Sequence, residues 1–265
     1  MSKLENAILT LNRLGSGAVR EDGIMHVDGR AALAVTVVYL FGVLSLPLTG
    51  PVRLLLFAVY PMVASILAGL SYGLLLLRSL YIVPLVALFA IFNPIYDRVP
   101  VEVSGIVISR GWLTFAGVIV RGILAFQALL LLVETEGFAG MCSAMRRLRV
   151  PAVLTTQLMM VYRYLTVLLT EALTMQRARR ARGYGRESLR IGEWGQFIGQ
   201  LFIRTVGRSE RIHRAMLARG FNGIDLPHFT SATPKWTHTD TLWVGVWCAV
   251  ICVLRFIDLP KLFNL

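Results

Sequence analysis

Long apolar runs are the feature that most restricts how this chain can fold. A membrane-spanning helix needs about 20 largely apolar residues to cross the hydrocarbon core of a bilayer. Hydrophobic residues make up 56% of the chain, more than the roughly 45 to 50% that is usual in a soluble domain. The sequence therefore predicts an all-α integral membrane protein with about five transmembrane helices. The expected spans are residues 31–48, 52–72, 74–96, 112–133 and 241–257.

Two short β-branched runs lie between the third and fourth spans. They flank Ser104 and Gly105 within residues 97–111, and a polar pair between such runs is typical of a hairpin turn. We therefore expect a small external hairpin inside a first membrane region, residues 31–134. A helix break between the second and third spans is expected around Gly73 to Arg78.

Positive charge is concentrated in one part of the chain. Residues 135–240 hold sixteen of the 27 Lys and Arg residues against seven of the 15 acidic residues, or +9 of the net charge of +12. Cytoplasmic loops of membrane proteins carry an excess of Lys and Arg. With four spans before this basic block, we expect the N-terminal segment, residues 1–30, and the block itself to be cytoplasmic. Residues 241–265 would then form the last span and a short external tail.

One more apolar run, residues 153–175, is long enough to be read as a sixth span. Crossing would immerse Arg163 and Glu171, at a cost of roughly 2.5 to 3.5 kcal/mol for an arginine near the helix centre. It would also leave arginines on both sides of the membrane, against the usual cytoplasmic bias. We therefore interpret this run as a long amphipathic helix on the cytoplasmic side, within a helical coupling domain.

Two stripes in the basic block repeat at intervals of four and three residues. The first runs from Leu154 to Met175, and its continuation reaches Arg182. The second is weaker and leads from Ile198 to Arg219. Such spacing lets one helix pack along another, so we predict two packed helices that each end at an arginine.

The tripeptide Ala-Arg-Gly stands at both of these ends and supplies the candidate site. Its members are Ala181, Arg182, Gly183, Ala218, Arg219 and Gly220. Glycine favours the left-handed conformation that closes a helix, which places each arginine in a last turn. There an arginine can satisfy terminal carbonyls and the helix dipole, or it can offer a fork of donors to a partner's carboxylate. Repetition at the ends of two stripes favours docking.

The block from Arg208 to Gly223 resembles the transmembrane T component of energy-coupling factor (ECF) transporters, most closely the CbiQ type of cobalt and nickel uptake systems. The stretch Arg179 to Gly183 is similar to that family's first Ala-Arg-Gly motif, and residues 218–220 are similar to its second. The segment 26–30 also looks like the family's entry into the first span, although Gly29 stands where a proline is more usual.

The resemblance implies a set of partners. Arg182 and Arg219 would each dock on one of two ABC ATPase subunits, which would bind ATP with Mg. A separate CbiM-like membrane subunit, with or without a small accessory membrane subunit, would bind the substrate. The complex would lie in a prokaryotic cell (inner) membrane and import cobalt or nickel, while a vitamin-type T component remains an alternative.

Residues with catalytic or metal-binding patterns are lacking. The chain has no Gly-x-x-x-x-Gly-Lys-Ser/Thr loop, and its four histidines have no metal-ligand spacing. We therefore expect no catalytic residues, no metal and no cofactor in this chain. A membrane-bound enzyme is the alternative of a different class. A basic block that binds nucleic acid or lipid electrostatically is a third reading; we expect membrane lipid but no nucleic acid as a partner.

Arg121 is a charged residue near the middle of the fourth expected span. Such a residue usually has a partner or a function. We expect a polar contact with another span, or else contact with the substrate-binding subunit.

Overall fold

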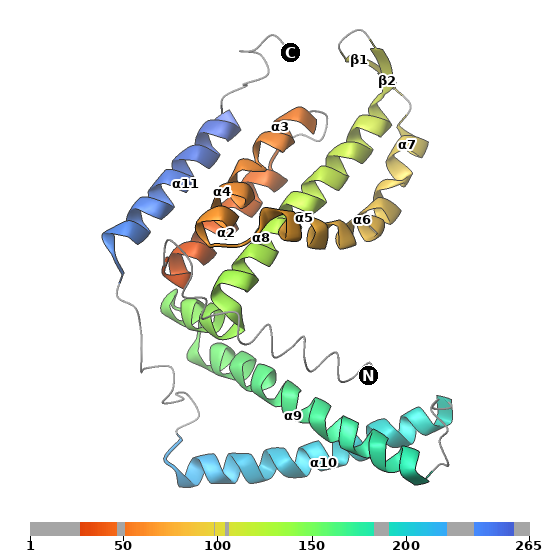
Figure 1. Ribbon diagram of the computed structural model, residues 1–265, viewed down its shortest axis with the longest axis vertical. Helices are drawn as coiled ribbons and strands as arrows, with labels where there is room; N and C mark the ends of the chain where they lie inside the picture. The colour runs from red at the N-terminus through yellow and green to blue at the C-terminus, as the bar shows by residue number, and fades with distance from the viewer. Residues whose placement is uncertain are drawn as a thin grey trace. The chain divides into compact units, whose positions relative to one another are not determined.

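The computed structural model describes six stretches of the chain, and all statements below concern these: residues 27–46, 51–97, 99–103, 106–182, 191–221 and 236–256. The chain forms two compact units. The apolar unit contains residues 17–137 and 234–265, and the basic unit contains residues 1–16 and 138–233. Helices dominate both units (Figure 1), so the predicted fold class, an all-α membrane protein, is confirmed.

The apolar unit holds most of the helices and the small sheet. Its elements are α2 (Gly29–Leu44), α3 (Pro51–Leu56), α4 (Val59–Leu67), α5 (Tyr72–Ser79), the 3-10 helix η1 (Leu80–Ile82), α6 (Val83–Ala90), α7 (Phe92–Tyr96), β1 (Pro100–Val103), β2 (Ile106–Ser109), α8 (Arg110–Arg147) as far as Gly137, and α11 (His238–Phe256).

Three helical stretches are long and apolar enough to cross a membrane by length and composition. They are Tyr72–Tyr96, Arg110–Arg147 and Ala152–Arg182, and Gly29–Leu44 and Leu54–Leu67 are shorter apolar helices. The second expected span is thus divided between α3 and α4, and the third is divided among α5, η1, α6 and α7. Pro84, which has no backbone N–H to donate, lies in the first turn of α6, directly after the 3-10 turn.

The helix break expected around Gly73 to Arg78 is wrong, because those residues lie inside α5. The chain turns earlier, at Gly69, whose φ of 70° is in the left-handed region. There the amide of Leu70 donates to the Ser65 carbonyl at 2.8 Å. This pattern satisfies carbonyls that the end of α4 leaves open.

Strands β1 and β2 pair antiparallel within the stretch where the sequence predicts a hairpin. Pro100 lies opposite Ser109, and Val103 lies opposite Ile106. The expected turn, Ser104 and Gly105, lies outside the described residues. The hairpin leads directly into α8, where Gly111 packs so closely on the backbone near Asp97 that a Cβ atom would clash.

Aromatic side chains form the centre of the apolar unit's core. The Tyr39 and Tyr60 ring centroids are 4.5 Å apart, and the Tyr60 ring meets Trp247 edge-on at 4.8 Å. These contacts join α2, α4 and α11. The Tyr39 hydroxyl also donates to the Phe57 carbonyl at 2.9 Å, at the interruption between α3 and α4. A buried side chain thus satisfies a backbone group that the broken helix exposes.

The first turns of α2 and α11 are tied together by a buried carboxylate, that of Asp240. Asp28 caps α2, and its amide donates to Asp240 Oδ1 at 2.8 Å. Asp240 Oδ2 accepts from both the amide and the hydroxyl of Thr237, just before α11, at 2.8 and 2.9 Å. Asp240 thus accepts the amide at the start of α11, as the acidic residue of a capping box does, and its other oxygen joins residues 212 positions apart in the sequence.

The basic unit contains the last part of α8, α9 (Ala152–Arg182) and α10 (Ile191–Ala218). The helical path of α8 is interrupted at Gly137, with φ 62° and ψ 173°. The Phe138 ring stacks on Tyr162 of α9 with centroids 4.6 Å apart. Arg149 has a φ of 67°, the one positive value outside glycine among the described residues, and it ends this segment two residues before Pro151.

Replacement of Tyr39 by Phe tests the hydrogen bond at the helix interruption. The change should lower the free energy of unfolding by about 1 to 3 kcal/mol, because the buried Phe57 carbonyl loses the hydrogen bond from the Tyr39 hydroxyl. Thermal unfolding of the purified protein in detergent measures the effect. Tyr81→Phe is the matched control, since Tyr81 is 83% exposed. Removal of its hydroxyl group should change the free energy of unfolding by less than about 0.5 kcal/mol. Equal melting temperatures for the two variants would contradict the prediction.

Candidate docking site at two helix ends

The first Ala-Arg-Gly motif lies at the end of α9. Arg182 is the last residue of this helix, and both Ala181 and Arg182 are exposed. Gly183 lies outside the described residues. Arg179, Arg180 and Arg182 place three cations in the last turn, where positive charge is stabilised by the helix dipole.

The second motif forms a complete helix end. Ala218 is the last residue of α10, and Gly220 has a φ of 82°. The amide of Phe221 donates to the Met216 carbonyl, and the amide of Gly220 donates to Leu217, both at 3.0 Å. These two bonds define a Schellman motif. Arg219 is therefore the cap residue, held at a defined place between a helix and a left-handed glycine.

Both arginine side chains are available to a partner. Arg182 and Arg219 are exposed, and among the described residues neither guanidinium has a hydrogen bond or an ion pair. Each can therefore offer its planar fork of donors to a carboxylate, a bidentate geometry that lysine does not reproduce.

Helices α9 and α10 cross, so their C-terminal ends are held apart. Arg204 of α10 donates to Glu171 of α9 at 2.8 Å, and Arg179 pairs with Glu193 near the start of α10. Figure 1 shows the C-terminal ends of the two helices on opposite sides of the crossing. At 1.5 Å per residue, Arg182 lies about 16 Å of helix beyond Glu171, and Arg219 lies about 22 Å beyond Arg204.

The two predicted packing stripes do not pack on each other along their lengths. In α9, Leu154 and Val161 are 55% and 64% exposed, while Ala172 is buried. In α10, Ile198 and Phe202 are 57% and 66% exposed. Because the helices cross instead of running side by side, most of each apolar stripe remains open to a partner or to lipid.

Arg121 makes an intramolecular contact in the apolar unit. Its guanidinium donates to the Leu46 carbonyl, just beyond the end of α2. Sequence reasoning missed a second pair in this unit, Arg78 of α5 with Glu134 of α8. The signal was present in the sequence, since each of these charges lies within or beside an apolar run. Both contacts tie α8 to other helices of the unit.

Metal-ligating side chains do not gather within the described part of the chain. No group of three or more His, Cys, Asp or Glu residues there could hold an ion. The buried carboxylates Asp28 and Asp240 are instead occupied in capping the two helices. The three cysteines are free thiols.

Comparison with known proteins decides the family. The family profile CbiQ, described as cobalt transport protein, matches residues 24–229. The chain belongs to this family. Both Ala-Arg-Gly motifs of this CbiQ-family protein lie inside the matched range. The chain is thus a member of a cobalt transport protein family and has helices long and apolar enough to cross a membrane.

Individual relatives match over shorter stretches. The cobalt transport protein CbiQ of Salmonella typhimurium is 30% identical over 149 residues, 52% of this chain and 66% of that protein. The CbiQ protein of Rhodobacter capsulatus is 33% identical over 93 residues, 35% of this chain and 38% of that protein. An uncharacterized protein of Methanocaldococcus jannaschii is 38% identical over 84 residues, 31% and 28% of the two chains. The chain thus spans 28% to 66% of these relatives' lengths.

Replacement of Gly220 by Ala tests the helix end that positions Arg219. A Cβ atom in the left-handed conformation costs about 1 to 2 kcal/mol, so the Phe221 amide should exchange with solvent roughly fivefold faster or more. Hydrogen exchange of the full-length protein measures this protection. Gly199→Ala is the matched control within α10, because a Cβ atom there meets nothing within 4 Å and alanine favours the helix. Unchanged Phe221 exchange in the Gly220 variant would refute the assignment.

Proposed function

We propose that this CbiQ-family protein is the transmembrane coupling subunit of an ATP-driven ECF-type cobalt importer. The observation that carries the proposal is the repeated Ala-Arg-Gly motif, with its two arginines exposed at the outward ends of crossed helices. A pair of ATPase subunits needs two separate attachment points, and Arg182 and Arg219 supply one each. The ATP and its Mg ion would be bound by those partners.

Docking would rely on a charge-assisted bond at each helix end. The Arg219 guanidinium extends from a cap residue whose backbone is held by the Schellman bonds to Met216 and Leu217. An acidic groove on an ATPase would receive it. The bidentate contact would set the orientation of the two partners as well as the binding affinity. The same logic applies to Arg182 at the end of α9.

The crossing would convert movement of one helix end into movement of the other helix. Because Glu171–Arg204 and Arg179–Glu193 join the two helices, closure of the ATPase pair would displace α9 and α10 together. The Phe138–Tyr162 stack links α9 to the last part of α8. From there the chain enters the apolar unit at Gly137. Movement would thus pass from α9 and α10 to the last part of α8 and then along the chain into the apolar unit.

The cargo is proposed to be cobalt, and a separate CbiM-like membrane subunit is proposed to bind it. The family description and the names of the two bacterial relatives support cobalt. The resemblance implies that nickel and vitamin-type systems share this coupling arrangement. The identity of the cargo would therefore depend on the substrate-binding partner. The intact complex should therefore be purified and its metal content determined by mass spectrometry.

Reversal of the two motif charges tests the coupling role. Arg182→Glu or Arg219→Glu should each weaken association with the ATPases by about 30-fold or more, because loss of one partner of a hydrogen-bonded charge pair costs about 2 to 5 kcal/mol. The double variant should insert into the membrane but lose co-purification of both ATPases and ATP-dependent cobalt uptake into vesicles. Retention of both properties by the double variant would overturn the proposal.

A matched control separates specific docking from general electrostatics. Arg214 also lies on α10, and its exposed side chain pairs with Glu210 at 3.7 Å. Arg214→Glu should leave ATPase association nearly unchanged. Arg219→Lys keeps the charge but removes the fork, so it should restore only part of the binding lost in Arg219→Glu. If all three arginine-to-glutamate variants weakened binding equally, a diffuse basic surface would explain the attachment better.

A further inference from the structure

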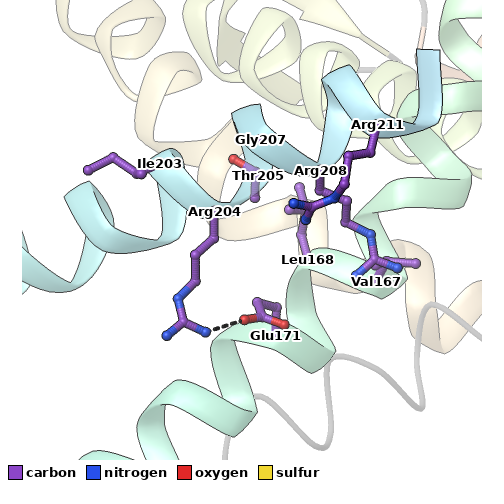
Figure 2. Close-up of a pocket in the computed structure, with 9 residues that line it drawn as sticks. All are labelled: Val167, Leu168, Glu171, Ile203, Arg204, Thr205, Gly207, Arg208 and Arg211. Atoms are coloured by element: carbon purple, nitrogen blue, oxygen red, sulfur yellow. Dashed lines mark hydrogen bonds and ion pairs between the residues drawn. The ribbon is translucent and has the colours of Figure 1, made fainter. Parts of the chain in front are cut away.

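The crossing of α9 and α10 borders a groove that contains two arginines, Arg208 and Arg211, which the coupling role does not use. It has a volume of about 310 Å³ and is lined by Val167, Leu168, Glu171, Ile203, Arg204, Thr205, Gly207, Arg208 and Arg211. Figure 2 shows the side chains of Arg208 and Arg211 extending from α10 into the space beside α9. The groove is separate from both helix ends, since Arg211 precedes Arg219 by about two turns and Glu171 precedes Arg182 by about three.

The charges in the groove are unbalanced. Glu171 is the one carboxylate in the lining, and Arg204 neutralises it at 2.8 Å. Arg208 and Arg211 have no ion pair or side-chain hydrogen bond within the described stretches. Two guanidinium groups three residues apart on one helix therefore share a cavity with a local charge of +2. Their repulsion favours an anion between them, and guanidinium forks match phosphate oxygens.

Exposed apolar side chains adjoin these arginines. Ile203 lines the groove and is 65% exposed. Leu168 lines it from α9, and its stripe continues to Leu165 and Val161, which are 38% and 64% exposed. A ligand with an anionic head and an apolar tail satisfies both features at once. The volume suits a headgroup-sized ligand and is too small for a helix of a partner protein.

We propose that this groove binds the phosphate diester of an anionic phospholipid, with Arg208 and Arg211 on the phosphate and the acyl chains along Leu165 and Val161. The proposal does not depend on ATPase docking, because it involves different residues. The expected occupant of the groove is a membrane lipid and not an acidic segment of another protein. Binding of this kind weakens with salt, as expected for contacts with an anionic membrane surface.

Native mass spectrometry of the full-length chain in neutral detergent tests this assignment. Phosphatidylglycerol should bind more tightly than phosphatidylcholine with the same acyl chains. The double variant Arg208→Gln/Arg211→Gln should bind phosphatidylglycerol about 30-fold more weakly, since each arginine near an anionic lipid contributes on the order of fivefold. Arg214→Gln, on the same helix but in a pair with Glu210, should change binding by less than about twofold.

Three results would overturn the proposal. The first is equal binding of phosphatidylglycerol by the double variant and the unaltered protein. The second is inorganic phosphate that binds as tightly as the lipid, which would remove the role of the apolar side chains. The third is binding of an acidic peptide that requires both arginines, together with lipid binding that does not require them. Arg208→Lys/Arg211→Lys, which keeps both charges, should recover part of the lipid affinity, and circular dichroism verifies that each variant is folded.

Discussion

Satisfaction of backbone hydrogen bonds in an apolar environment is the constraint on which the rest of this structure depends. Helices satisfy these bonds along their length, but interruptions and ends leave carbonyl groups open, and lipid offers them no partner. The apolar unit supplies side chains at these places. Tyr39 donates to Phe57 between α3 and α4, and Arg121 donates to Leu46 beyond α2. The polar residues inside the apolar runs therefore hold the broken helices together.

The same treatment of helix ends positions the candidate docking residues in the basic unit. Gly220 closes α10 through two backbone bonds and leaves Arg219 at a fixed position. The crossing of α9 and α10, held by Glu171 and Arg204, then separates this end from that of α9. The helix end at Gly220 and the ion pairs between α9 and α10 together produce two separated, exposed arginines. This arrangement is the physical basis for proposing attachment to two ATPases.

The basic unit also leaves apolar surface uncovered. A helix that buried its stripe against a neighbour would not expose Val161 or Phe202 to more than 60%. These faces, next to the arginines of the groove, are suited to lipid and to membrane partners. The structure thus accounts for a chain that is both strongly basic and strongly apolar. Its unpaired arginines are available to anionic groups, and its exposed stripes are available to other apolar surfaces.

The sequence by itself determined the membrane class, the concentration of positive charge and the helix-ending motif at Gly220, because run length, charge and glycine are local properties of the chain. The interruptions of the second and third spans were harder to foresee, although Pro84 suits the start of α6 and Gly69 suits the turn that follows α4. Only the tertiary structure decided that the two predicted stripes cross, that Arg121 reaches Leu46 and that Arg208 and Arg211 share a groove. Those features depend on contacts between residues far apart in the sequence, which periodicity along one helix cannot specify.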